Sequence, residues 1–253
     1  HSALLIADCV KTTARGPGSV PAPRPPRSRG AHHWPHVARI AQEWWNGPVE
    51  LFNALPSSPV LSPRHAVLGT PIDAAPVDGQ QVVHFAAGCF WGVEKAMWSV
   101  PGVIATATGY MGGHCPIPSY EQVCAHGTGH AEAVRVVFDA VAAPFGRLVA
   151  LFFEIHDPTQ ADGQGNDLGD QYRSAIWTTT ADQFDIASRT RDAFQRELAA
   201  HGFGAITTSI APAPASDSPG RFWFAEERHQ QYLAKNPGGY ECHARTGLSC
   251  PAL

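Results

Sequence analysis

From about Gln81 onward, the sequence alternates between apolar runs of strand length and longer runs with helical apolar spacing. Strand character is present in QVVHFA, VIATATGY, HAEAVRVVFDA, QYRSAIWTT and AITTSIAPA. Helical spacing is present in WGVEKAMWSV, PFGRLVALFFEIHDP and TADQFDIASRTRDAFQRELAAHG, and a short helix is expected in FAEERHQQYLAKNPGG. The longest helix has a capping box from Thr180 to Gln183 and stops at Gly202. This alternation predicts an α+β fold in which helices pack on one mixed sheet.

The residues outside this patterned region have a different character. Residues 1–46 include GPGSVPAPRPPRSRG, and a Pro- and Arg-rich composition of this kind buries little apolar surface, which predicts disorder. Residues 47–80 are punctuated by proline and predict an extended arm. The arm leads into a catalytic domain at 81–240, which a tail at 241–253 follows. The tail shows no helical or strand period, so we expect it to be mobile.

Composition narrows the classes of function. The net charge of −4 implies no broad basic face, so we expect no nucleic-acid partner. No apolar run approaches the length of about 20 residues that a membrane-spanning helix needs. Six cysteines in 253 residues are too few for a disulfide scaffold, which indicates a reducing compartment in which thiols are kept for chemistry. We therefore expect a cytoplasmic protein, and a monomer.

Cys89 stands where a predicted strand is followed by a predicted helix, in the segment AAGCFWGVEK. At the N-terminal end of a helix, unpaired backbone N–H groups favour the thiolate and lower its pKa. The glycines on both sides let a substrate or the backbone approach closely. This setting favours a reactive thiol over the buried structural cysteine that is common in proteins. Phe90 and Trp91 are either core residues or the wall of an apolar pocket beside the sulfur.

Glu132 interrupts an otherwise apolar face of the predicted strand HAEAVRVVFDA, which it shares with Val134, Val136 and Phe138. If that face is buried, desolvation raises the pKa of the carboxyl, which then holds a proton near neutral pH as a general acid must. The alternative is that Glu132 lies at a solvated strand end. The pattern alone leaves both alternatives open.

Further candidates lie in the loops and the tail. The turn GNDLGDQY holds Asp167 and Tyr172, and Tyr120 ends a proline-rich loop; turn hydrogen bonding and ordinary packing are the alternatives to a catalytic role. Cys242 and Cys250 lie in the tail. Two thiols on a mobile segment suit a resolving arm that carries a disulfide outward, and the alternative is a pair of idle thiols.

A metal site is a further question, because Cys115, Cys124, His126 and His130 lie close together in the sequence. Their spacing matches no common zinc pattern, and the two histidines flank a glycine turn rather than sharing a helix face. We therefore expect no metal site.

Five segments together resemble the A-type peptide methionine sulfoxide reductases. They are GCFWGVEKAMWSVPGV, GYMGG, HGTGHAEAVRVVFD, HDPTQADGQGNDLGDQYRSAI and FAEERHQQYLAKNPGGY. The resemblance covers about Leu51 to the C-terminus and leaves the first ~46 residues outside it, so these receive no function. It implies a ferredoxin-like α+β roll with a mixed sheet and long ordered loops. It also implies reduction of the S epimer of methionine sulfoxide, protein-bound and free, in the repair of oxidised proteins.

The resemblance implies roles for the residues around the first thiol. Cys89 would attack the sulfoxide sulfur, and Phe90 and Trp91 would hold the S-methyl group in an apolar pocket. Glu132 would protonate the sulfoxide oxygen, because that oxygen is a poor leaving group until it is protonated. The hydroxyls of Tyr120 and Tyr172 would assist the carboxyl, with Asp167 supporting that network.

The resemblance also implies a relay of thiols. Methionine leaves, and Cys89 becomes a sulfenic acid. Cys242 would condense with it to a disulfide, Cys250 would take over that bond, and thioredoxin would reduce it. No metal or organic cofactor is implied. Glu241 stands between Tyr240 and Cys242, where the family often has the cysteine directly after the tyrosine, and this leaves the order of attack open.

Three cysteines have no assigned role in the relay. Cys9 lies in the extension, Cys115 follows a glycine loop, and Cys124 is expected to be structural. Two other functions remain as alternatives. One is a cysteine hydrolase in which His130 or His156 is the base, and the other is a metal-binding module.

Overall fold

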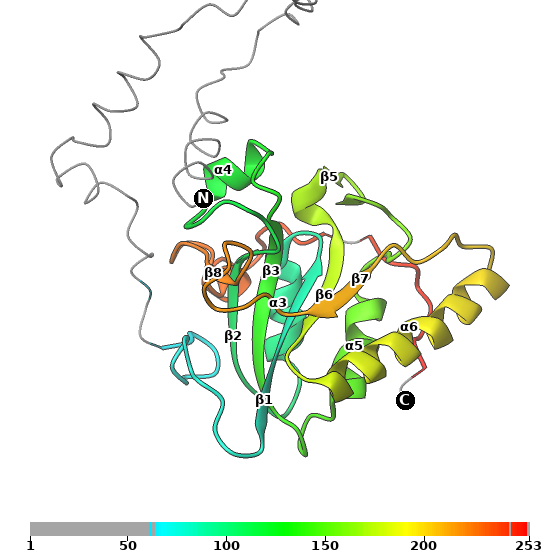
Figure 1. The fold of residues 1–253 in the computed structure, drawn as a ribbon, viewed down its shortest axis with the longest axis horizontal. Helices are drawn as coiled ribbons and strands as arrows, with labels where there is room; N and C mark the ends of the chain where they lie inside the picture. The colour runs from blue at the N-terminus through cyan, green and yellow to red at the C-terminus, as the bar shows by residue number, and fades with distance from the viewer. Residues whose placement is uncertain (1–60, 62–63, 243, 252–253) are drawn as a thin grey trace, which may run out of the picture.

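The computed structural model describes residues 61, 64–242 and 244–251. Its central sheet has six strands in the order β7–β6–β1–β3–β2–β8 (Figure 1). These strands are β1 Gln80–Ala87, β2 Val103–Met111, β3 Ala131–Asp139, β6 Ser174–Thr178, β7 Ser209–Pro212 and β8 Trp223–Phe224. Neighbouring strands are antiparallel except β6 and β7, which are parallel. The α+β fold with a mixed sheet is therefore confirmed.

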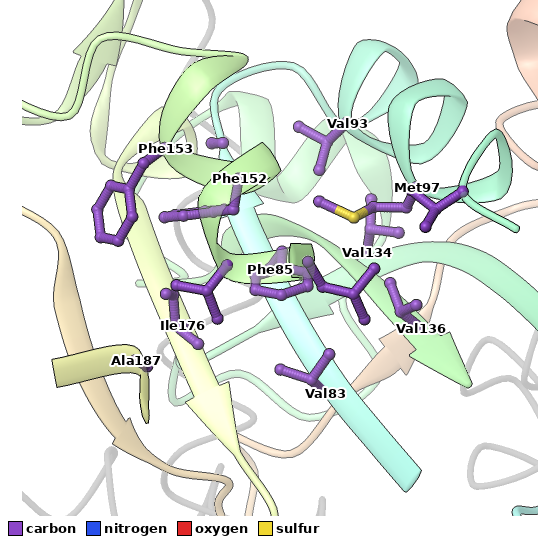
Figure 2. Close-up of a cluster of buried hydrophobic side chains, with 14 of the residues drawn as sticks. Val83, Phe85, Val93, Met97, Val134, Val136, Phe152, Phe153, Ile176 and Ala187 are labelled. Carbon is purple, nitrogen blue, oxygen red and sulfur yellow. The ribbon is translucent and has the colours of Figure 1, made fainter. Parts of the chain in front are cut away.

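Three helices cover one face of this sheet. They are α3 Phe90–Trp98, α5 Phe145–Glu154 and α6 Ala181–Ala200; the described residues also form two short helices, α4 Tyr120–Cys124 and α7 Tyr232–Lys235. Apolar side chains of β1, β3 and β6 form one buried cluster with those of α3, α5 and α6. Figure 2 shows this cluster, in which the ring of Phe85 stacks on that of Phe152 with centroids 5.2 Å apart. A smaller cluster around Trp177 lies on the other face of the sheet.

The alternation predicted for β3 is confirmed. Val134, Val136 and Phe138 belong to the helix-covered cluster, and Ala131 and Ala133 belong to the cluster on the other face. Both faces of the strand are buried, so its polar residues are held away from solvent unless they lie at an edge.

The helix starts agree with the sequence only in part. The side chain of Thr180 accepts a hydrogen bond from the Gln183 N–H, as predicted. A capping box also needs the Gln183 side chain to bond the Thr180 N–H. That part of the prediction is wrong, because Gln183 Oε1 accepts from the Thr179 N–H instead (2.9 Å). A complete capping box joins Ser119 and Gln122 at the start of α4, a helix that the sequence did not predict.

The arm and the tail both contact the domain where they are described. The predicted extension at 1–46 and the beginning of the predicted arm at 47–80 lie outside the described residues. Farther along the arm, His65 and Ile72 are buried. The described tail residues form no helix or strand, and Cys250 is buried with the core cluster. The mobility of the tail stays a prediction.

In the part of the chain that the structure covers, no helix has the length and apolar character needed to cross a bilayer.

Candidate active site

Cys89 lies between the end of β1 and the start of α3, at the N-cap position. Gly88 precedes it with φ +84°, in the left-handed region that favours glycine. A Cβ atom at Gly88 would meet Gln164 Cγ at 2.7 Å, so a side chain there would collide as well. The glycine lets the chain turn sharply and lets the segment around Gln164 pack close to the thiol. The Cys89 residue itself is 8% exposed.

Glu132 lies on β3 opposite the beginning of α3. Its Oε2 accepts a hydrogen bond from the Phe90 N–H at 3.0 Å, and the residue is 2% exposed. Burial raises the pKa of this carboxyl to about 8; the Phe90 bond lowers it and the nearby Asp167 charge raises it. The carboxyl thus holds a proton at neutral pH. The buried alternative from the sequence is the correct one.

The electrostatics of the thiol differ from the sequence prediction. Burial raises the pKa of Cys89 well above its usual value, and the Glu132 charge raises it further. The Trp91 N–H at the helix start lowers it, as predicted, but that effect is outweighed. The sequence predicted a lowered pKa for Cys89, and this is wrong for the free enzyme. The helix terminus lies inside the protein rather than at its surface, so burial outweighs its effect. A protonated Glu132 carries no charge, and this removes one of the two largest obstacles to the thiolate.

Two predicted tyrosines lie near the carboxyl, one on α4 and one on the 3₁₀ turn η2 Asp170–Tyr172. Burial raises the pKa of the Tyr120 hydroxyl, and a hydrogen bond to Cys124 raises it further. Burial also raises the pKa of the Tyr172 hydroxyl, followed by the charge of Glu132. Both hydroxyls therefore remain protonated and can donate hydrogen bonds.

Asp167 is at the start of the short strand β5 Asp167–Leu168, which pairs with β4 Gly163–Gln164. Its Oδ2 accepts a hydrogen bond from the Tyr240 hydroxyl at 3.0 Å. Its charge also raises the pKa values of Glu132 and Cys89. The hairpin thus brings the predicted aspartate beside both the acid and the thiol.

An aromatic wall stands next to the thiol. Phe90 is buried, whereas Trp91 is half-buried and stacks on Tyr232 with ring centroids 3.9 Å apart. The Trp91 indole N–H donates to His229 Nδ1 at 3.3 Å, and His229 also packs against Tyr120 with centroids 4.5 Å apart. We call Phe90, Trp91, His229 and Tyr232 the aromatic wall. This wall can hold an apolar group beside the sulfur.

The sequence reasoning missed His229 and Tyr232, as well as Glu226 and Tyr110. Glu226 Oε2 accepts from the Tyr110 hydroxyl (2.8 Å), and Oε1 accepts from the Tyr120 N–H (2.9 Å), so the two residues hold α4 in place. The segment EERHQQY, which contains Glu226, His229 and Tyr232, was the available signal. Two glutamines and the histidine of this polar segment are buried, and buried polar side chains usually have a defined hydrogen-bond partner.

The structure separates the two tail cysteines. Cys242 and Cys89 line one cavity of about 20 Å³, with Gly92, Gln164 and Glu241 among the other lining residues. The Cys242 thiol donates to the Gln164 carbonyl at 3.5 Å, in the segment that packs against Gly88, the residue before Cys89. Cys250 lies instead against α5, where its N–H donates to Glu154 Oε1 at 2.8 Å.

The histidines proposed as bases for a hydrolase are already engaged. His156 pairs with the Phe152 carbonyl through Nδ1 and with Ser174 Oγ through Nε2, both at 2.7 Å. His130 Nε2 donates to the Cys115 carbonyl (2.7 Å), and its Nδ1 accepts from the Gly113 N–H (3.2 Å). Neither ring has a nitrogen left to take a proton from a thiol. Among the described residues, no group of three or more His, Cys, Asp or Glu side chains could hold a metal ion.

Comparison with known proteins gives one consistent picture. Residues 81–251 match the family described as peptide methionine sulfoxide reductase. The chain is 51% identical over 210 residues to a Salinispora arenicola protein named peptide methionine sulfoxide reductase MsrA, covering 80% of this chain and 93% of the relative. It is 52% identical over 192 residues to the protein of that name from Xanthomonas euvesicatoria, covering 76% and 86%.

Solved structures agree with the sequence relatives. Methionine sulfoxide reductase A of Corynebacterium diphtheriae superimposes with a TM-score of 0.66 and 43% identity, covering 78% of this chain and 93% of that one. The reduced form of Mxr1 from Saccharomyces cerevisiae superimposes with a TM-score of 0.60 and 30% identity, covering 68% and 94%.

Proposed function

The chain belongs to the peptide methionine sulfoxide reductase family, and we propose that Cys89 and Glu132 carry out its reduction of methionine sulfoxide to methionine. One observation above all supports this pair. The Phe90 N–H, directly after the thiol, bonds a buried carboxyl that is protonated at neutral pH. A sulfoxide group placed between the Cys89 sulfur and the Glu132 carboxyl meets a nucleophile and an acid at the same time.

The first step transfers one oxygen. The Cys89 sulfur attacks the sulfoxide sulfur while Glu132 gives its proton to the sulfoxide oxygen, and the hydroxyls of Tyr120 and Tyr172 donate hydrogen bonds to that oxygen. The S–O bond of the substrate breaks, and the released hydroxide adds to the Cys89 sulfur. The new S–S bond breaks at the same time, so methionine leaves and Cys89 becomes a sulfenic acid. The thiol proton replaces the one that Glu132 lost, so protons balance. The aromatic wall holds the substrate methyl group, and Asp167 raises the pKa of the acid.

The second step forms the first disulfide. The Cys242 thiol attacks the Cys89 sulfenic acid, a sulfur–sulfur bond forms, and one water molecule leaves. The shared cavity supports Cys242 as the first resolving thiol, and the burial of Cys250 against α5 supports its later entry. Cys250 then exchanges onto Cys242 and releases the Cys89 thiol. This exchange requires the tail to leave Glu154.

We further propose thioredoxin as the reductant of the tail disulfide. Cys89 is too buried for a protein thiol to reach directly, and transfer of the disulfide along the tail removes that obstacle. A cytoplasmic location is part of the same proposal, because the relay works only where its thiols are returned to the reduced state. We assign the S epimer as the substrate, both protein-bound and free.

An assay on separate epimers tests this proposal. The enzyme is incubated with dithiothreitol and either methionine S-sulfoxide or R-sulfoxide, and methionine is counted. We expect product from the S epimer alone. Product mainly from the R epimer, or no methionine from either epimer, would overturn the proposal.

A further inference from the structure

Glu94 is a fully buried carboxyl that the proposed chemistry does not use. It lies on α3, four residues after Phe90, and has 0% exposure. Its Oε1 accepts from the Thr106 hydroxyl (3.1 Å) and from Gln231 Nε2 (2.8 Å), and its Oε2 accepts from the Gln231 N–H (2.8 Å). Burial raises its pKa to about 7, and the bonds from Gln231 and Thr106 oppose this. A buried carboxyl with three donors fixes the groups that donate to it.

One side of this network reaches the arm. Because the Thr106 hydroxyl donates to Glu94, its oxygen accepts from His65 Nε2 at 2.8 Å. The other nitrogen of that ring, Nδ1, accepts from the N–H groups of Val67 and Leu68 (3.1 and 3.0 Å). Both nitrogens of His65 are therefore satisfied in the neutral form. The arm is joined to α3 through a chain of bonds with one consistent direction.

The other side of the network reaches the aromatic wall. Gln231 has φ +47°, in the left-handed region where a non-glycine residue needs support from its surroundings. Glu94 supplies that support through both the backbone and the side chain of Gln231, and the Ala66 N–H bonds Gln231 Oε1 (3.2 Å). The next residue is Tyr232, whose ring stacks on Trp91 at an angle of 18°. The backbone at Gln231 thus determines where the Tyr232 ring lies.

We propose that Glu94 is a positioning residue that, by fixing Gln231, sets Tyr232 against Trp91 and so shapes the pocket for the substrate methyl group. The inference rests on the proposed function, because it requires Trp91 to contact the substrate. The bonds of Glu94 run to Gln231 and Thr106 rather than to Cys89 or Glu132. Loss of Glu94 is therefore expected to weaken substrate binding and to leave the rate of the chemical step almost unchanged.

Single-turnover kinetics on four variants test this role. Glu94→Gln replaces one carboxylate oxygen with an NH₂ group, which then meets a hydrogen-bond donor instead of accepting from it. Thr106→Val removes the hydroxyl that bridges Glu94 and His65 and keeps the shape of the side chain. Thr106→Ser restores the hydroxyl. Gln183→Ala is the matched control, because Gln183 is also buried and bonds Thr179 and Val82, at the start of α6.

We expect the variants to change the half-saturating sulfoxide concentration and to leave the maximal single-turnover rate almost unchanged. For Glu94→Gln, the half-saturating sulfoxide concentration should rise about tenfold, the effect of losing one charge-assisted bond, with a maximal rate within about twofold of wild type. Thr106→Val should show a smaller rise, about threefold, and Thr106→Ser should be close to wild type. Without substrate, the indole N–H resonance of Trp91 in NMR spectra, assigned with Trp91→Phe, should move in Glu94→Gln. Gln183→Ala should lower thermal stability and change neither readout.

Unchanged half-saturation and an unmoved Trp91 resonance in a folded Glu94→Gln protein would overturn the proposal. If Glu94→Gln does not fold, the comparison of Thr106→Val with Thr106→Ser decides by the same two readouts. The NMR readout needs no turnover. If the wild-type enzyme reduces no sulfoxide, the proposed function fails, and the Trp91 resonance alone then decides whether Glu94 positions the wall.

Discussion

The Phe90 N–H donates a hydrogen bond to Glu132 Oε2 at 3.0 Å, and this contact joins the start of α3 to the middle of the sheet. The side chain of Cys89 makes no capping bond to its own helix, and the carboxyl from β3 accepts a hydrogen bond from the first backbone N–H of the helix, that of Phe90. The thiol and the acid are therefore held at a fixed separation by two elements that pack in the core. A change that moves Glu132 is expected to disturb the helix start that carries Cys89.

Replacement of Glu132 by glutamine should slow the sulfoxide step by about 10²–10⁴-fold, the usual contribution of a general acid. The amide can still accept from the Phe90 N–H, so the helix start should keep its geometry. The rate of methionine formation in a single turnover measures the step. A neutral-pH rate equal to that of wild type would remove Glu132 from the mechanism.

The pH dependence of the same step gives an independent check. The pKa of Glu132 is raised to about 8, so its proton is present below pH 8 and lost above it. The wild-type single-turnover rate should therefore fall as pH rises through about 8. In Glu132→Gln this fall in rate through pH 8 should be absent. The rate of the variant should still increase at low pH, where solvent supplies the proton to the sulfoxide oxygen. A wild-type rate that climbs through pH 8 would show that ionisation of the thiol, and not the acid, limits the step.

Much of this architecture follows from local patterns, and what was missed depends on contacts between distant segments. The strand at β3 was predictable because both of its faces alternate, but burial of Glu132 depends on α3 lying over it. The same packing raises the pKa of Cys89, which the helix-terminus argument alone had lowered. Helix α4 is only five residues long and lacks a readable period, although Ser119 and Gln122 form its capping box.

The tail cysteines should be required only when the reductant is a protein. Replacing Cys242 and Cys250 together by serine should stop thioredoxin-driven turnover, because Cys89 is almost fully buried. Dithiothreitol is small enough to reach the site and should largely restore turnover. The steady-state rate with each reductant measures this, and normal turnover of the double variant with thioredoxin would rule out the relay.

The single change Cys250→Ser separates the two resolving steps. The Cys89–Cys242 disulfide should still form, because these two thiols line the same cavity, while recycling by thioredoxin slows. Peptide mapping under non-reducing conditions identifies the pair. A map in which Cys89 is joined to Cys115 or Cys124 would show that the order of attack is different.

Shortening the chain from its N-terminus should have no effect until the arm is reached. A chain that begins at Glu50 should fold and keep full activity, since residues 1–46 have a composition that builds no core. A chain that begins at Asp78 should lose at least about 2 kcal/mol of stability, because it lacks the buried residues His65 and Ile72. Urea unfolding of the two chains measures the difference, and equal midpoints would contradict the role given to the arm.

Acid should destabilise the fold partly through His156. Burial lowers its pKa to about 4, below the value of about 6.5 in an unfolded chain. Its contribution is therefore fully present above pH 6.5 and is lost as pH falls through 4, at up to about 1.4 kcal/mol per pH unit. His156→Gln should flatten the dependence of the unfolding free energy on pH between 6.5 and 4. Parallel slopes in wild type and His156→Gln would contradict this assignment.

The most direct test of the central claim measures the methionine and the oxidised cysteine formed in one turnover. Enzyme carrying Cys242→Ser and Cys250→Ser is mixed with methionine S-sulfoxide and no reductant, and both the methionine formed and the oxidised cysteine are determined. The account predicts one methionine per enzyme and a sulfenic acid at Cys89, and no methionine when Cys89→Ser is added to the same chain. Methionine formed without Cys89, or a sulfenic acid found at Cys124 instead, would contradict it.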